Sequence, residues 1–227
     1  MLPIRDSAPG RTFPFVTVGL IAANAAVFVV YQLPDLERSV VDYGFFPCGI
    51  DGTCPGLGSS WIVTAFTSMF LHGGWDHLLG NMLFLWIFGN NVEDALGRIR
   101  YFAFYIVSGL VATATQTVVT FLAAGPAAER IPNVGASGAI AGVLGAYLVL
   151  LPRARVLVWS FFFLFEVPAV AFLGFWFVFQ LWLGSFSVLQ PEQGGGVAFF
   201  AHVGGFVFGM LAVNALASRR PARGALG

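Results

Sequence analysis

Six apolar stretches, each able to cross or nearly cross a lipid bilayer, decide what this 227-residue chain can fold into. A transmembrane helix needs about 20 apolar residues, because the hydrocarbon core is about 30 Å thick. In chain order the stretches are Phe13–Leu33, His77–Asn91, Tyr101–Ala124, Gly135–Leu151, Val167–Gly184 and Phe199–Ala217. Only 10% of the residues are charged, whereas a soluble domain carries about 25%. The sequence therefore predicts an all-α integral membrane protein, a bundle of six transmembrane helices.

Arginine predicts how the chain is oriented, since the sequence contains no lysine. With six spans, the side that holds both termini carries Arg5, Arg11, Arg98, Arg100, Arg153, Arg155, Arg219, Arg220 and Arg223. The opposite side carries only Arg38 and Arg130. Positive residues collect on the cytoplasmic side of membrane proteins, so we expect both termini to be cytoplasmic. Residues 1–11 are then a short cytoplasmic segment, 12–217 the membrane domain and 218–227 a basic tail, with the first stretch retained as a helix.

The fourth stretch is short for a membrane span. Its 17 residues would form a helix of about 25 Å, against a hydrocarbon core of about 30 Å. Pro152, Arg153 and Arg155 fix its lower end at the cytoplasmic face. The upper end, with Ser137, should stop below the outer surface, and irregular backbone at that depth must be buried in protein or line a water-filled cavity. We therefore expect the Ser137 hydroxyl at the floor of an outward-open cavity.

Ser137 and His202 are the candidate nucleophile and base. Small residues accompany each of them at helical spacing: Ala141 and Gly145 follow Ser137, while Gly205 and Gly209 follow His202. Small residues let two helices approach closely in lipid, which would bring the hydroxyl and the imidazole together. His202 could then take the Ser137 proton and activate the hydroxyl. The alternative is that each side chain only hydrogen-bonds or packs locally, and no carboxylate near His202 in sequence completes a triad.

His77 and Asn81 lie four residues apart, on one face of the second stretch. Side chains of both kinds can donate to the oxyanion that forms in acyl transfer. A polar clamp between helices is the alternative. A metal site with His72 is disfavoured, since no cysteine or acid completes a set of ligands. With a net charge of zero and no basic run, nucleic acid is not an expected partner.

Two further features leave their interpretation open. Cys48 and Cys54 lie in the first long loop and could form a disulfide or remain free thiols. The fifth stretch is rich in phenylalanine and tryptophan and includes Gln180. We interpret it as a lipid-facing wall with interfacial aromatic anchors.

Three motifs in order resemble the rhomboid intramembrane serine proteases. They are Phe70-Leu71-His72-Gly73-Gly74-Trp75-Asp76-His77 with Leu79-Gly80-Asn81-Met82, then Gly135-Ala136-Ser137-Gly138-Ala139, then Ala201-His202-Val203-Gly204-Gly205. The resemblance covers residues 12–217 and implies that Ser137 is the nucleophile and His202 the general base. It also implies that His77, Asn81 and the Ser137 backbone N–H form the oxyanion hole, and that His72 orders the outer loop or holds water. Glu93 matches an acidic position with a structural role.

The sequence departs from the family pattern at two places. Many members carry a tyrosine four residues after the serine, stacked on the histidine, where this chain has Ala141. Many carry Trp-Arg in the first outer loop, where this chain has Trp61-Ile62. The first departure leaves open what supports the His202 ring.

The resemblance implies an intramembrane serine endopeptidase that hydrolyses peptide bonds in or near transmembrane segments through a Ser137–His202 dyad. The alternative is a catalytically silent relative that binds transmembrane helices. Transmembrane proteins and the lipid bilayer are the expected partners, and no cofactor or metal is implied. We expect a multi-pass protein of the bacterial cytoplasmic (inner) membrane, with its site open to the extracytoplasmic side.

Overall fold

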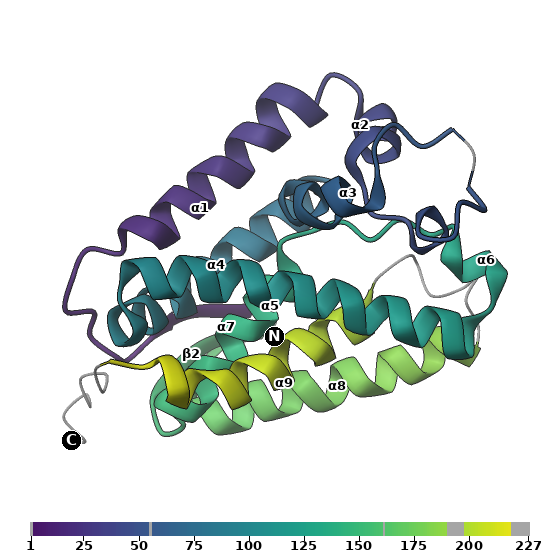
Figure 1. The fold of residues 1–227 in the computed structure, drawn as a ribbon. Coiled ribbons are helices and arrows are strands. Elements are labelled where there is room, and N and C mark those ends of the chain that lie inside the picture. Colours follow the sequence, from purple (N-terminus) through teal and green to yellow (C-terminus); the bar gives the residue numbers. More distant parts are fainter. Residues whose placement is uncertain (1, 55, 161, 190–197, 219–227) are drawn as a thin grey trace.

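The computed structural model describes residues 2–54, 56–160, 162–189 and 198–218 and shows a helical bundle (Figure 1). Four helical segments are long and apolar enough to cross a membrane: Phe15–Gln32, Arg98–Ala124, Ala169–Val188 and Phe199–Leu216. Two shorter apolar helical segments are Trp61–Phe70 and Ser137–Leu150. The expected helical membrane bundle is thereby confirmed. The basic tail expected after residue 218 lies outside the described residues.

The described helices comprise six that overlap the predicted apolar stretches and three short ones that lie in the connections between them. They are α1 (Phe15–Ala26), α2 (Leu36–Tyr43), α3 (Trp61–Thr67), α4 (Trp75–Leu96), α5 (Arg98–Val119), α6 (Pro126–Glu129), α7 (Ser137–Leu150), α8 (Ala169–Leu189) and α9 (Phe199–Leu216). Two of them continue as π-helical turns, α1 to Gln32 and α5 to Ala124. The second predicted span lies within α4, a helix of 22 residues that carries the polar residues of its motif.

Helix α7 is the centre of the bundle. All ten residues from Gly138 to Tyr147 are buried, and α4, α5 and α9 pack around them. Its 14 residues rise about 21 Å, less than the ~30 Å hydrocarbon core. The helix is thus shorter still than the 17-residue span that the sequence predicted, and it begins at Ser137.

Glycines bring the backbones of α7 and α9 into direct contact. A Cβ atom at Gly205 would overlap the Gly138 carbonyl oxygen, and one at Gly209 would overlap the Gly142 carbonyl oxygen. From the other side, a Cβ at Gly145 would overlap the Phe206 carbonyl. Only glycine permits this approach, so these positions fix the spacing and the register of the two helices.

The far end of α4 holds the start of α1. Glu93 is buried, and its carboxylate accepts hydrogen bonds from the Val16 and Thr17 backbone N–H groups at 3.0 and 2.8 Å. These N–H groups have no partner within their own helix, so the carboxylate satisfies two otherwise unpaired donors of the first turn. This is the structural role expected for Glu93.

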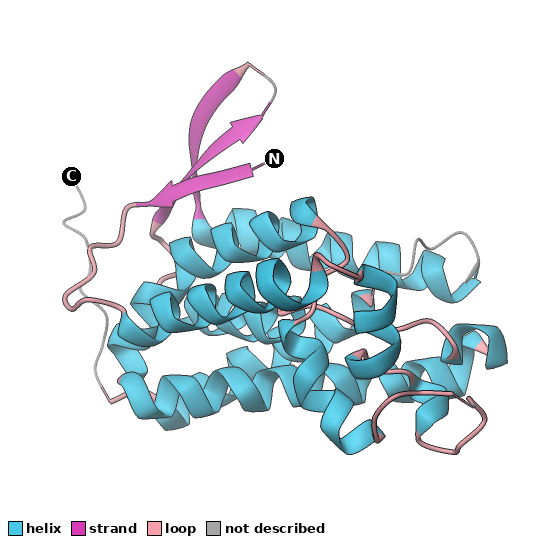
Figure 2. Ribbon diagram, turned by 90° about the horizontal axis from the view of Figure 1, so that it is seen from above, coloured by secondary structure: helices cyan, strands magenta, loops and turns pink. Residues whose placement is uncertain are grey.

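A three-stranded antiparallel sheet lies at the same end of the bundle, beyond the helices that the sequence predicted. It comprises β1 (Leu2–Asp6), β2 (Arg155–Ser160) and β3 (Phe163–Pro168) in the order β1-β2-β3. Leu2 lies opposite Trp159, and Asp6 lies opposite Val156. The first residues, for which the sequence predicted no secondary structure, are therefore paired with the connection between α7 and α8. Figure 2 shows the sheet projecting from the side of the helices.

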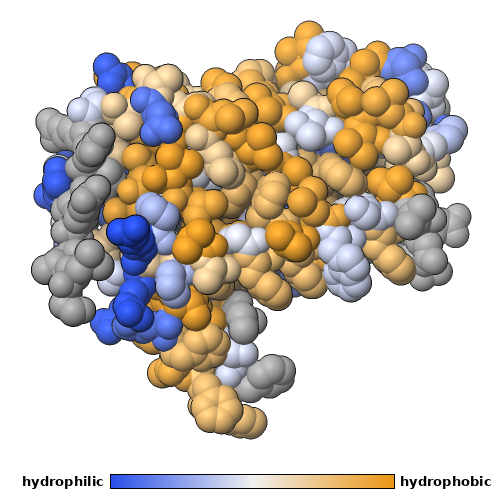
Figure 3. Space-filling view, turned by 90° about the horizontal axis from the view of Figure 1, so that it is seen from below, coloured by the Kyte–Doolittle hydropathy of each residue, from blue (hydrophilic) through white to orange (hydrophobic). Residues whose placement is uncertain are grey.

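Apolar side chains cover much of the molecular surface, as they must where a protein meets lipid. Figure 3 shows a broad hydrophobic area over the helices, with most of the strongly hydrophilic residues gathered near one end. The apolar surface continues onto the β2–β3 hairpin, whose Phe162, Phe163 and Leu164 are 94%, 72% and 61% exposed.

Asp6 anchors β1 to the bundle. Its carboxylate accepts hydrogen bonds from the Tyr147 hydroxyl of α7 and, at 2.9 Å, from the Asn91 amide of α4. Burial raises the pKa of the Asp6 carboxyl from 3.8 to about 6, although the Tyr147 hydrogen bond acts in the opposite direction. Desolvation therefore outweighs the hydrogen bonds at this position.

Asp6→Asn should make the protein more stable at pH 7 and remove part of its pH dependence. The raised pKa means that the folded state binds a proton more tightly than the unfolded state, so stability falls as pH rises from about 4 to about 6. A pKa shift of this size corresponds to at most about 3 kcal/mol of unfolding free energy. After solvent screening, we expect Asp6→Asn to raise the unfolding free energy at pH 7 by about 1–2 kcal/mol. An asparagine oxygen keeps both hydrogen bonds without the charge.

Thermal unfolding in detergent between pH 4 and 8 measures this effect as the difference between wild type and variant. Glu37→Gln is the matched control, since Glu37 is an exposed carboxylate in the first turn of α2. Equal pH dependence of the wild type and Asp6→Asn would contradict the assignment.

A disulfide closes part of the loop between α1 and α3. Cys48 and Cys54 are bonded, which settles the alternative that the sequence left open. Nearby, Phe45 and Asn133 exchange two backbone hydrogen bonds, of 3.2 and 2.7 Å. This bridge ties the first loop to the segment that leads into Ser137.

Candidate active site

Ser137 is the first residue of α7, and the backbone before it is held from two sides. The Gly135 N–H donates to the Ser68 carbonyl at 2.9 Å. Gly135 has φ +125°, a conformation that side chains rarely adopt. A Cβ there would lie 2.8 Å from the Cε1 and Nε2 atoms of the His77 ring. Glycine at this position thus lets the loop pass directly over His77 and turn into the helix.

The Ser137 and His202 side chains meet between α7 and α9. His202 Nε2 lies 2.7 Å from Ser137 Oγ, within hydrogen-bonding distance. The contact follows from the glycine packing, because Gly205 sits one turn after His202 and touches the Gly138 carbonyl. The small-residue faces identified in the sequence therefore do bring the two side chains together.

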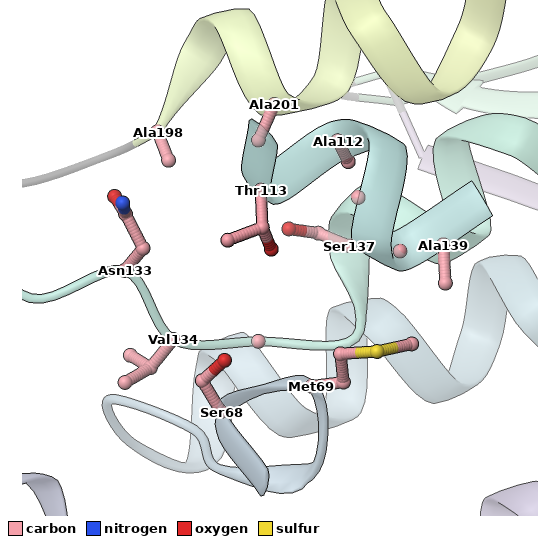
Figure 4. A pocket seen from close by; sticks show the side chains of 13 residues that line it. Ser68, Met69, Ala112, Thr113, Asn133, Val134, Ser137, Ala139, Ala198 and Ala201 are labelled. Atoms are coloured by element: carbon pink, nitrogen blue, oxygen red, sulfur yellow. The ribbon is translucent and has the colours of Figure 1, made fainter. Parts of the chain in front are cut away.

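A small cavity opens beside the Ser137 hydroxyl. It is lined by α5, by the loop before α7 and by the start of α9, with Thr113, Asn133 and Ala198 among its walls. Figure 4 shows the Ser137 side chain directed into this space. Its volume of about 30 Å³ exceeds the ~10–15 Å³ that one water molecule needs. A hydrolytic water fits beside the hydroxyl.

His77 and Asn81 project from α4, which packs against α7. The Gly73 N–H points to His77 Nδ1 at 3.2 Å, which leaves Nε2 on the side of Gly135 to carry the ring proton. The Asn81 side chain is 8% exposed, and its buried amide nitrogen has no hydrogen-bond partner among the described residues. A buried donor without a partner is costly in a native protein. His77 thus offers an N–H beside the loop that leads into Ser137, and Asn81 offers an unpartnered amide one turn further along α4.

His72 is held through its backbone. Gln32, at the end of the first span, accepts from the His72 N–H at 2.8 Å and donates to the His72 carbonyl at 3.1 Å. The His72 ring is buried and lies edge-on to the His77 ring, with centroids 5.1 Å apart. This arrangement connects the outer loop to the start of α4.

The support of the His202 ring comes from α8, the stretch that its aromatic composition predicts to be a lipid-facing wall. Gln180 is only 7% exposed, and its side-chain oxygen lies 2.8 Å from His202 Nδ1. One turn earlier, the Trp176 ring lies 5.8 Å from the imidazole at an angle of 36°. Trp176 and Gln180 are thus the α8 side chains that contact the imidazole in a chain that has Ala141 four residues after the serine.

One signal in the sequence could have located these residues. Gln180 is a lone amide in a strongly apolar stretch, and polar side chains within membrane spans nearly always face the protein interior. Trp176, four residues earlier, shares its helical face. That face of α8 lies against α9 rather than lipid.

Comparisons with known proteins agree with the geometry. The sequence profile of the rhomboid domain matches residues 59–219. "Rhomboid protein 1, mitochondrial" of Saccharomyces cerevisiae is 31% identical over 195 residues, which are 85% of this chain and 50% of the yeast protein. "Presenilin-associated rhomboid-like protein, mitochondrial" of Bos taurus is 28% identical over 198 residues, 85% of this chain and 46% of the bovine protein.

A bacterial relative is shorter. "Putative rhomboid protease YdcA" of Bacillus subtilis is 30% identical over 140 residues, covering 62% of this chain and 64% of that protein. The chain spans about half the length of the yeast and bovine relatives that it matches.

The comparisons correct the expected location. We expected a bacterial cytoplasmic membrane with an extracytoplasmic opening, but the yeast and bovine relatives are both mitochondrial proteins by name. That prediction is contradicted. Its multi-pass membrane character is supported by the long apolar helices of the bundle.

Proposed function

Because this chain belongs to the rhomboid family, we propose that it is an intramembrane serine endopeptidase with Ser137 as its nucleophile and His202 as its general base. Family membership supports an intramembrane protease-like function. The observation that carries the finer proposal is the 2.7 Å contact between His202 Nε2 and Ser137 Oγ at the head of a short, buried helix. Residues 12–217 are the proposed membrane domain.

The proposed reaction begins when Ser137 Oγ attacks the carbonyl carbon of a substrate peptide bond. His202 Nε2 takes the hydroxyl proton, and the carbonyl oxygen becomes a negatively charged oxyanion. The unpartnered Asn81 amide, the His77 Nε2–H and the Ser137 backbone N–H are the proposed donors to that oxyanion. Donors fixed in advance in a dry site stabilise such a charge far more than water does.

The tetrahedral intermediate then collapses, and the peptide C–N bond breaks. His202 gives its proton to the leaving amine, which departs as the new N-terminus of the second fragment. An ester remains between Ser137 and the first fragment. A water molecule in the adjacent cavity attacks this ester, His202 again accepts and returns the proton, and Ser137 Oγ is restored.

The proposed substrates are transmembrane segments of other proteins. A peptide bond in a regular helix is shielded by its own hydrogen bonds, so the segment must unwind before attack. The cavity at the head of α7 holds polar groups from Ser68, Asn133 and Ser137, which could satisfy backbone groups that unwinding exposes.

A serine-directed fluorophosphonate tests the proposal without a known substrate. We expect covalent labelling of the folded wild-type protein in detergent, because His202 activates the Ser137 hydroxyl for attack on phosphorus. Ser137→Ala should remain unlabelled, while Ser68→Ala, which alters another hydroxyl lining the cavity, should label normally. Absence of labelling in a folded wild-type sample would instead support a silent relative that binds transmembrane helices.

A further inference from the structure

Gln180 is the one side-chain amide in α8, and it is turned inward. Its neighbours in the chain, Phe179 and Leu181, are 41% and 37% exposed, whereas Gln180 is 7% exposed. A buried amide in an apolar span is expensive unless it is hydrogen-bonded. The partner that the structure provides is the second ring nitrogen of His202, at 2.8 Å.

The two contacts of His202 fit the tautomer that a general base needs. To activate Ser137, Nε2 must accept the hydroxyl hydrogen, so the proton of the neutral ring has to be on Nδ1. Nδ1–H then needs an acceptor, and the side-chain oxygen of Gln180 is in place to accept it. A neutral imidazole whose Nδ1–H has no partner would exchange freely between its two tautomers, and one of them cannot serve as the base.

Aromatic rings bound the imidazole but cannot select the tautomer. Trp176 lies tilted at 5.8 Å, and Phe199 lies edge-on at 6.5 Å. Both restrict where the ring can lie, yet neither offers an oxygen to Nδ1. His202 makes no ion pair with an acid among the described residues, so the amide oxygen is the group that distinguishes the two nitrogens.

We propose that Gln180 is a positioning residue, which holds His202 in its Nδ1–H tautomer with Nε2 directed at Ser137. It fills the third place of a Ser–His–acceptor arrangement with a neutral amide in place of a carboxylate. The inference rests on the proposed protease function for its purpose, but the hydrogen bond itself can be tested without turnover. In serine proteases a buried acid performs this orienting task, and its loss through the wrong tautomer costs about 10⁴-fold in kcat.

The tautomer can be observed directly, because the chain contains only three histidines. Nitrogen-15 labelling of histidine yields three imidazoles, and His202→Ala identifies the signals of His202. In wild type we expect a protonated Nδ1 and an unprotonated Nε2 for the neutral ring. Gln180→Met, which keeps the length of the side chain without its acceptor, should give a mixture of the two tautomers, whereas Gln180→Glu should keep the wild-type tautomer.

Gln116 of α5 offers a matched control, because it is a second glutamine whose side chain contacts α9, the helix that carries His202. Its side-chain oxygen accepts from the Phe200 and Ala201 N–H groups at the start of α9, at 3.0 and 3.2 Å. Gln116→Met therefore removes a glutamine that holds α9 without touching the His202 ring. It should lower thermal stability and leave the His202 tautomer as it is in wild type.

The kcat and KM values of Gln180 variants show whether Gln180 positions His202 or only stabilises the fold. On a model transmembrane substrate, Gln180→Met should lower kcat by about 10- to 100-fold with little change in KM, since the loss affects the base and not substrate binding. Gln180→Glu should recover most of kcat, because a carboxylate oxygen also accepts from Nδ1–H. Gln116→Met should keep the wild-type kcat once the amount of folded enzyme is matched.

The outcomes distinguish this inference from the proposed function. An unchanged His202 tautomer in folded Gln180→Met, together with normal fluorophosphonate labelling of wild type, overturns the role of Gln180 alone. Absence of labelling in wild type, with a tautomer that does respond to Gln180→Met, overturns the protease but leaves the orienting hydrogen bond in place. Should Gln180→Met fail to fold, Gln180→Glu carries the test, and a lost tautomer preference there contradicts the inference.

Discussion

Ser137→Ala is expected to abolish cleavage of a transmembrane substrate, with kcat at least about 10⁴-fold below wild type. The alanine removes the nucleophile while its Cβ keeps the packing of the first turn of α7. His202→Ala should cause a loss of similar size, because the hydroxyl without its base is a weak nucleophile. The double variant should be no worse than either single one, since the two groups act as a unit.

Cleavage is measured on a model transmembrane substrate in proteoliposomes, with the products identified by mass. Thr113→Val is the matched control, because Thr113 lines the same cavity without a hydrogen bond to His202. It should retain activity within a few-fold of wild type. If either Ser137→Ala or His202→Ala kept wild-type cleavage while folded, the assignment of the pair would be wrong.

Gly209→Ala should destabilise the protein strongly, although it adds only one methyl group. The added Cβ would overlap the Gly142 carbonyl oxygen, which is backbone and cannot rotate away. Helices α7 and α9 would have to separate along their central contact, at a cost of about 3 kcal/mol or more. Because Ser137 and His202 lie on these two helices, activity should fall together with stability.

Thermal unfolding in detergent measures the effect, and Gly174→Ala is the control. Gly174 lies within α8, where an added Cβ would meet nothing within 4 Å. That variant should be neutral or gain about 0.5–1 kcal/mol, because alanine is the better helix former. If Gly209→Ala unfolded at the same temperature as Gly174→Ala, the close backbone contact between α7 and α9 at Gly209 would be contradicted.

The meeting of Ser137 and His202 could be predicted because small residues leave few ways to pack two helices. In α7 and α9, glycines recur every three or four residues, and backbone-to-backbone contact then fixes the register to within one turn. The sequence also predicts that α7 is short, because Pro152 and the arginines after it end the apolar stretch. The spacing of the glycines therefore predicts the contact between Ser137 and His202, and the length of the apolar stretch predicts the short helix.

The sheet and the role of Gln180 depend on information that local patterns do not contain. Leu2 pairs with Trp159 from a distant part of the chain, and no periodicity within either segment names its partner. Strand β3 also runs without a break into the apolar stretch of α8, which concealed where the strand ends. For Gln180, the lone amide in an apolar helix indicates which face turns inward, but the contact with His202 is set by the packing of α8 against α9.

The pairing of β1 with β2 also constrains how the chain is threaded through the membrane. Two strands can hydrogen-bond only when they lie on the same side, so an even number of crossings must separate Asp6 from Arg155. Helices α1, α4, α5 and α7 are the elements between them that can serve as crossings, while α2, α3 and α6 are short. Four crossings satisfy the parity, and three or five would pull the strands apart. The sheet thus requires an even number of crossings between the two strands, independently of where the arginines lie.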